Sequence, residues 1–103
     1  ILSPEFVKLA STPSPALPEK GAYHTTQEVY GHGWWLNRAL PERGIESAIP
    51  GVPGDSYMAQ GHYGQILLVI PAWDTIVVRL GNDSKGAKFD LKKMGELLKA
   101  ARR

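Results

Sequence analysis

Two apolar runs, Gln65–Ile70 (QILLVI) and Thr75–Leu80 (TIVVRL), flank the short segment Pro71–Asp74 (PAWD). Both runs are rich in β-branched side chains, so each predicts a β-strand. Their continuous apolar character predicts strands that are buried on both faces of a sheet. The Pro-containing segment between them is typical of a hairpin connection. The sequence therefore predicts an antiparallel sheet built around this hairpin.

Toward the C-terminus, Asp90 is a typical N-cap residue and begins a predicted helix over residues 91–101. The apolar residues of this helix recur at helical spacing, which places them on one face. They are Leu91, Met94, Leu97, Leu98 and Ala101. We therefore expect the helix to pack on one face of the sheet.

Two further strands are predicted on the N-terminal side of the hairpin. Ser56–Gln60 is a short strand that ends at Gly61, and Val29–Asn37 (VYGHGWWLN) is an aromatic-rich strand. Glycines within the latter indicate that another backbone or a ligand approaches closely there. Residues 38–55 are rich in Gly and Pro and predict a long loop.

The N-terminal segment predicts one short helix. Ser3, Pro4 and Glu5 form a typical helix start, and the helix is expected over residues 4–10. Its apolar stripe consists of Phe6, Leu9 and Ala10. The segment 11–18 holds three prolines and predicts a loop, and residues 19–28 show no pattern.

Together these elements predict an α+β protein with an antiparallel sheet of three or four strands and a C-terminal helix on one face. The length of 103 residues allows one domain, which we assign to residues 1–103. Apolar residues make up 43% and charged residues 21%, as in a folded soluble protein. The longest apolar run, Ile66–Ile70, is too short to cross a bilayer.

The absence of cysteine excludes a disulfide framework, a thiol nucleophile and a Cys-based zinc site. The three histidines, His24, His32 and His62, are too scattered to predict a metal site, so no metal or cofactor is expected. The chain begins Ile1-Leu2-Ser3 without a visible targeting signal, so its compartment stays open.

Charge is distributed unevenly along the chain. Residues 1–78 hold four basic and seven acidic residues, a net −3, whereas residues 79–103 hold eight and three, a net +5. The basic C-terminal quarter allows two interpretations, a solvated helix face or a surface for nucleic acid or anionic lipid. The basic residues of the predicted helix and its end are Lys92, Lys93, Lys99, Arg102 and Arg103.

No complete catalytic motif is present. The chain lacks Ser-x-x-Lys, Tyr-x-Asn and phosphate-binding glycine loops, and Gly54–Met58 lacks the last Gly of Gly-x-Ser-x-Gly. The segment Tyr57–Gln65 does carry Gly61 and Gly64 between two predicted strands. An exposed backbone N–H there would be able to stabilise an oxyanion, and the alternative is an ordinary bulge or turn.

The order of five segments resembles the C-terminal part of the β-lactamase-fold serine hydrolases. This superfamily includes class C β-lactamases, penicillin-binding proteins, family-VIII carboxylesterases and 6-aminohexanoate-dimer hydrolases. The matching segments are Ile1–Glu5, Tyr30–Asn37, Ala59–Gln65, Val69–Pro71 and Asp74–Arg79, followed by the closing helix. The resemblance implies that residues 1–103 are a C-terminal fragment of such a hydrolase.

The resemblance also implies roles for individual residues. Ala59-Gln60-Gly61 takes the place of the Lys-Thr-Gly motif, and the backbone N–H of His62 takes the oxyanion position. Gln60, Gly61 and Tyr63 are then expected to bind substrate. The missing Lys favours an ester or amide over a β-lactam. The family's nucleophilic Ser-x-x-Lys and its Tyr are absent, so this chain alone is expected to be inactive.

A fragment of this kind would expose a sheet edge and an apolar face. The expected partners are the N-terminal part of the same protein or a second copy in a homodimer, with a small ester or amide as substrate. Two alternatives remain, a non-catalytic protein-interaction module and a small basic nucleic-acid binder. The nucleic-acid binder is ranked last because the chain lacks a recognisable nucleic-acid-binding motif.

Overall fold

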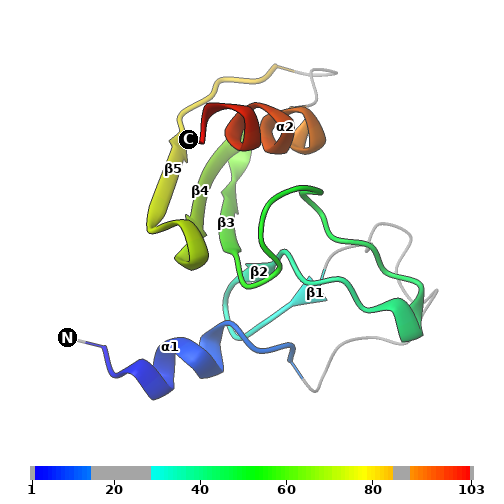
Figure 1. Cartoon of the computed structure of the whole chain (residues 1–103). Helices are drawn as coiled ribbons and strands as arrows, with labels where there is room; N and C mark the ends of the chain where they lie inside the picture. Colours follow the sequence, from blue (N-terminus) through cyan, green and yellow to red (C-terminus); the bar gives the residue numbers. More distant parts are fainter. Residues whose placement is uncertain (1, 15–28, 85–88, 103) are drawn as a thin grey trace.

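The computed structural model describes residues 2–14, 29–84 and 89–102. A five-stranded antiparallel sheet has the order β1-β2-β3-β4-β5, and a helix stands at each end of the chain (Figure 1). The elements are α1 (Pro4–Ala10), β1 (Val29–Tyr30), β2 (Trp35–Leu36), β3 (Tyr57–Gly61), β4 (Gln65–Ile70), β5 (Thr75–Arg79) and α2 (Leu91–Ala101). The predicted α+β class with a C-terminal helix is thus confirmed.

The sheet has more strands than predicted because the segment 29–37 is not one strand. It forms the hairpin β1–β2, in which Val29 pairs with Leu36 and the N–H of Gly31 donates to the carbonyl of Trp34 at 2.7 Å. The prediction of close backbone approach is confirmed at Gly31, where a Cβ atom would lie 2.5 Å from the carbonyl oxygen of Ala10. This contact seats the C-terminal end of α1 against the hairpin.

Both predicted helices form at the expected residues because their caps are satisfied. The Ser3 hydroxyl accepts from the N–H of Phe6 at 3.1 Å, and the Asp90 carboxylate accepts from the N–H of Lys93 at 2.9 Å. Side-chain acceptors at these positions satisfy N–H groups that have no partner within the helix. The apolar stripe expected on α1 is mostly uncovered in the described part of the chain, since only Ala10 is buried.

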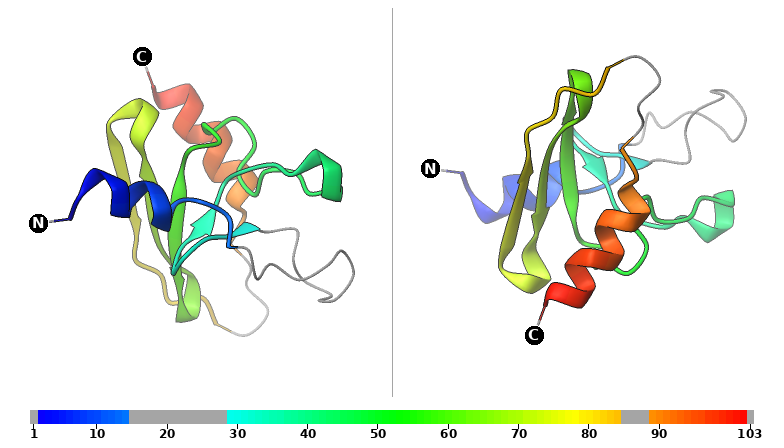
Figure 2. Two further views of the ribbon diagram at one scale, coloured as in Figure 1. Left: turned by 90° about the horizontal axis from the view of Figure 1, so that it is seen from below. Right: turned by 90° about the horizontal axis from the view of Figure 1, so that it is seen from above.

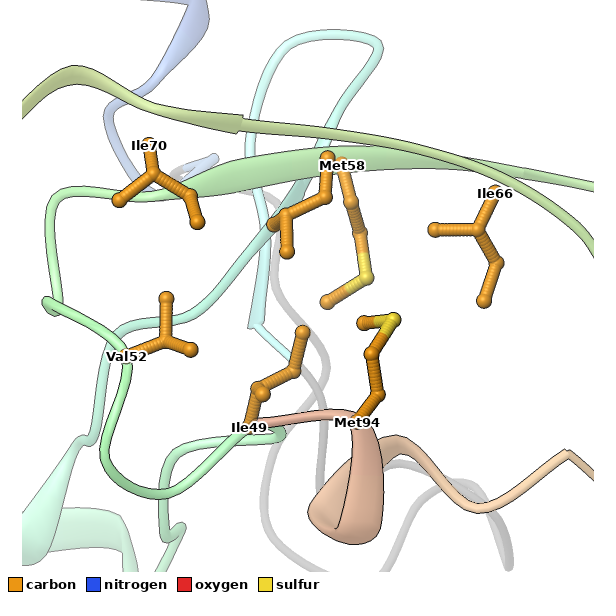
Figure 3. Packing of buried hydrophobic residues seen from close by; sticks show 7 residues of the cluster. Ile49, Val52, Met58, Ile66, Ile70 and Met94 are labelled. Atoms are coloured by element: carbon orange, nitrogen blue, oxygen red, sulfur yellow. The ribbon is translucent and has the colours of Figure 1, made fainter. Parts of the chain in front are cut away.

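The core lies between one face of β3–β5 and a layer formed by α2 and the loop after β2. Both views in Figure 2 place α2 and this loop on the same side of the strands. The buried side chains of this cluster come from all three parts, and Figure 3 shows them pointing toward one another. They are Ile49, Val52, Met58, Ile66, Leu68, Ile70 and Met94.

The face of α2 that meets the core is narrower than predicted. Met94 and Gly95 are buried and Leu91 and Leu98 are partly buried. Of the other two residues predicted on this face, Leu97 is 60% exposed and Ala101 is exposed as well. Gly95 lies against the loop so closely that a Cβ atom would be 2.6 Å from Ile49. This close approach brings the glycine, rather than Leu97, into the core.

The expectation that Gln65–Ile70 and Thr75–Leu80 are buried on both faces is wrong. Burial alternates along β4, and on β5 Ile76 and Val78 are 66% and 61% exposed. Paired residues of neighbouring strands point to the same face, so Leu67 and Val78 share this outer face. Within the described residues, α2 and the 49–52 loop cover only the other face.

Buried Asn37 holds the loop over the core. Its amide donates to the carbonyls of Ile49 and Val52 at 3.1 and 3.0 Å and accepts from the N–H of Ile49 at 2.7 Å. The predicted loop over residues 38–55 therefore contributes two core side chains, Ile49 and Val52.

Among the described residues, no helix combines the length and the apolar content needed to cross a membrane.

Candidate functional site

The segment singled out in the sequence lies at one end of the sheet, where β3 runs past β2. β2 pairs only with Tyr57 and Met58, whereas β4 pairs with the whole of β3. Within the described residues, Ala59–Gly61 thus has a strand partner on one side only. Backbone donors and acceptors along such an edge are able to bind an extended ligand.

The edge ends in a strained turn at His62–Gly64, in which Tyr63 departs from helical geometry. Tyr63 has φ 59° and ψ 30°, a left-handed conformation that costs a residue other than glycine about 1–3 kcal/mol. His62 and Tyr63 are exposed, and their rings lie 4.0 Å apart between centroids. His62 is the first residue of this exposed turn, directly after the end of β3.

A group of hydrogen bonds from the end of β5 holds this turn. The N–H of Asp83 donates to the carbonyl of Tyr63 at 3.1 Å, and Nη1 of Arg79 donates to the carbonyl of Gly64 at 2.6 Å. The side-chain amide of Gln65 both accepts from the N–H of Gly81, at 3.0 Å, and donates to its carbonyl. We call Gln65, Arg79, Gly81 and Asp83 the turn brace.

The charges within the turn brace neutralise each other. Arg79 and Asp83 form two hydrogen bonds, Nη2 to Oδ1 at 2.8 Å and Nη1 to Oδ2 at 3.1 Å. Such a bidentate pair fixes the geometry of both groups. The guanidinium carbon lies over the Phe89 ring, 4.1 Å from its centre. The guanidinium is thus committed to internal partners rather than to a ligand carboxylate.

A hollow of about 330 Å³ lies beside the edge and the turn. Gln60 and Gly61, predicted to bind substrate, line it together with the apolar side chains Ile66, Phe89 and Leu91. His62 and Tyr63 are outside this lining, at the exposed tip of the turn. The four predicted site residues are consecutive in the sequence, and the structure places Gln60 and Gly61 in the lining of the hollow and His62 and Tyr63 outside it.

The histidines and the basic C-terminal residues are the other candidates from the sequence, and Arg103 lies outside the described residues. No group of three or more His, Asp or Glu side chains in the described part of the chain could hold a metal ion, and His24 lies outside the described residues. On α2, Lys93 pairs with Glu96 at 3.1 Å, and the guanidinium of Arg102 lies 5.0 Å from the Trp73 ring centre.

The turn brace was not identified from the sequence. A signal for it exists, because Arg79 interrupts an otherwise apolar strand and Asp83 follows at the fourth position. Nothing in the sequence, however, connects these residues to a turn fifteen residues earlier.

The comparisons with known proteins find no relative. No protein-family model matches this chain, and neither a curated protein nor a solved structure is similar to it at the level that indicates relationship.

Proposed function

We propose that this chain is the C-terminal portion of a β-lactamase-related serine hydrolase that cleaves esters or amides by acyl transfer. The observation that carries the proposal is the open edge of Ala59–Gly61, which ends in the exposed, braced turn at His62–Gly64. An open strand edge followed by a rigid backbone donor supports binding of a carbonyl substrate next to an oxyanion donor. The antiparallel strands β3–β5, with α2 packed on one face, support a β-lactamase-like fold.

In this mechanism the backbone N–H of His62 donates to the oxyanion. When a hydroxyl attacks the substrate carbonyl, negative charge develops on the carbonyl oxygen, and a preorganised N–H stabilises it. Gln60 and Gly61 bind the substrate along the edge, and Tyr63 borders it at the turn. The internal pairing of Arg79 supports an uncharged ester or amide, because the guanidinium is held by Asp83.

The attacking hydroxyl and its base belong to another part of the protein in this proposal. The chain has no Ser-x-x-Lys, and a nucleophile needs its base within hydrogen-bond reach. The N-terminal part of the same protein is the proposed partner. The exposed apolar side chains Leu67, Ile76 and Val78 support this assignment, since they form a face that an additional layer would cover.

A pair of substitutions in the complete encoded protein tests the proposal. His62→Pro removes the backbone N–H, whereas His62→Ala keeps it and serves as the matched control. With a nitrophenyl ester or anilide as substrate, we expect His62→Pro to lower kcat by about 10²–10³-fold and His62→Ala to change it little. Equal activity of both variants would refute the role of His62.

The isolated chain provides a second test. It should not hydrolyse these substrates above the buffer rate, and the complete reading frame should encode Ser-x-x-Lys upstream of Ile1. A frame without that motif would refute the assignment to this class of hydrolase.

The exposed outer face of the sheet also favours a second candidate, a non-catalytic protein-interaction module. In that case the chain would form a homodimer or bind another protein through Ile76 and Val78. The complete protein would then lack hydrolytic activity, and Val78→Lys would abolish the association in light scattering.

A further inference from the structure

The carbonyl groups of the strained turn have fixed partners, and these partners come from a distant part of the sequence. Tyr63 and Gly64 both have positive φ angles, 59° and 84°. Their carbonyls are bound by the Asp83 N–H and the Arg79 guanidinium, respectively. Each of these bonds holds one peptide plane of the turn, and a trans peptide is planar. The His62 N–H belongs to the Gly61–His62 peptide, which lies between these held planes and the strand pair of Gly61 with Gln65, so its orientation is restricted from both sides.

The two holding groups are themselves oriented by their surroundings. Side-chain bonds between Arg79 and Asp83 join the two holding residues, and Phe89 stacks on the guanidinium. Both side chains of the pair are largely buried, at 25% and 20% exposure. Burial and bidentate geometry restrict the movement of this pair far more than that of an exposed ion pair.

We propose that Arg79 and Asp83 are positioning residues. By binding the carbonyls of Tyr63 and Gly64, they keep the His62 N–H directed toward the position of the oxyanion. The inference rests on the proposed function, because it concerns the same oxyanion donor. Arg79 is not among the residues that line the hollow beside Gln60, whereas Asp83 is. The effect of Arg79 is therefore confined to alignment, so it should appear in the transition state rather than in ground-state binding.

Arg79→Met tests the inference, since it keeps the aliphatic stem but removes the guanidinium. In the complete protein we expect kcat to fall on the order of 10- to 100-fold with KM unchanged, because a misaligned group loses catalytic effect without losing substrate contacts. Lys93→Met is the matched control, because it removes an ion pair that is exposed on both sides. It should leave kcat unchanged.

A rescue experiment separates positioning from general destabilisation. Tyr63→Gly relieves the left-handed strain, because glycine adopts positive φ freely. Because Tyr63 also borders the proposed substrate, Tyr63→Gly alone is the reference for the double variant. Adding Arg79→Met to Tyr63→Gly should lower kcat by a much smaller factor than in the parent protein. An equal fold-loss of kcat in both backgrounds, or an equal loss in Lys93→Met, would overturn the inference.

Amide hydrogen exchange on the isolated chain gives a readout without catalysis. The Asp83 N–H, bonded to the Tyr63 carbonyl, should exchange at least tenfold faster in Arg79→Met. Unchanged exchange would overturn the positioning inference even if His62→Pro is inactive. Conversely, full activity of His62→Pro would refute the proposed function while faster exchange still showed that the brace holds the turn. Asp83→Asn provides a second variant if Arg79→Met does not fold.

Discussion

Replacing Asn37 by alanine should strongly destabilise the protein. The Asn37 side chain is fully buried, and it connects β2 to the loop that carries Ile49 and Val52 into the core. Its amide is the only side chain among the described residues that bonds the backbone of this loop at both positions. Truncation would therefore affect the loop and the core together.

The magnitude follows from the groups that would lose their partners. The Ile49 carbonyl would keep a bond from the N–H of Val52 at 3.3 Å. The Ile49 N–H and the Val52 carbonyl would lose the Asn37 amide. Each buried polar group left without a partner costs about 1–3 kcal/mol, so we expect a total loss of about 2–6 kcal/mol for the two groups. Natural domains are stable by about 5–15 kcal/mol, so this loss is a large fraction.

Urea unfolding followed by tryptophan fluorescence measures the effect. With a urea dependence of about 2 kcal/mol/M, the midpoint of Asn37→Ala should fall by about 1–3 M. Asn82→Ala is the control, because Asn82 is exposed, and its midpoint should be close to that of the parent chain. If the two alanine variants unfolded at the same urea concentration, the assigned role of Asn37 in holding the loop would be wrong.

Three further substitutions test the packing. Gly95→Ala should lower the free energy of unfolding by about 1–3 kcal/mol despite the better helix propensity of alanine, because its Cβ would lie 2.6 Å from Ile49. Urea unfolding would detect this loss, and a more stable variant would contradict the packing of α2. Val78→Lys should change the free energy of unfolding by no more than about 0.5 kcal/mol, because Val78 is 61% exposed. It should also reduce the binding of a hydrophobic dye to this face. A large loss of stability would show that the face is covered. Gly31→Ala should detach α1 from the β1–β2 hairpin, because its Cβ would lie 2.5 Å from the carbonyl oxygen of Ala10. We expect faster amide exchange in α1 of this variant, and unchanged exchange would argue against the contact.

Local chemistry predicted most of the regular structure. The Ser3 and Asp90 caps placed both helices, and the segment Gln65–Ile70 was identified as a strand at its observed bounds. These features depend on neighbouring residues only, through capping, side-chain shape and turn composition. The β1–β2 hairpin was missed because Gly31 and Gly33 turn the chain within a segment whose composition is typical of a strand.

The candidate site was predicted in part. Gln60, Gly61, His62 and Tyr63 were identified from the glycine pattern and the family resemblance, and the structure places them at an open edge and an exposed turn. The His62→Pro experiment tests their proposed role. The sequence contained no information on the hollow beside Gln60, because its lining comes from three separate segments.

By itself, the sequence determined part of the regular structure of this protein. This part consists of the two capped helices, the hairpin of β4 and β5, and the glycine-containing turn after β3. The tertiary structure alone decided which face of β4 and β5 is buried, that Asn37 holds a loop in the core, and that Arg79 and Asp83 hold the turn. The reason is that apolar composition indicates a capacity for burial, whereas actual burial and side-chain pairing depend on which distant segments come into contact.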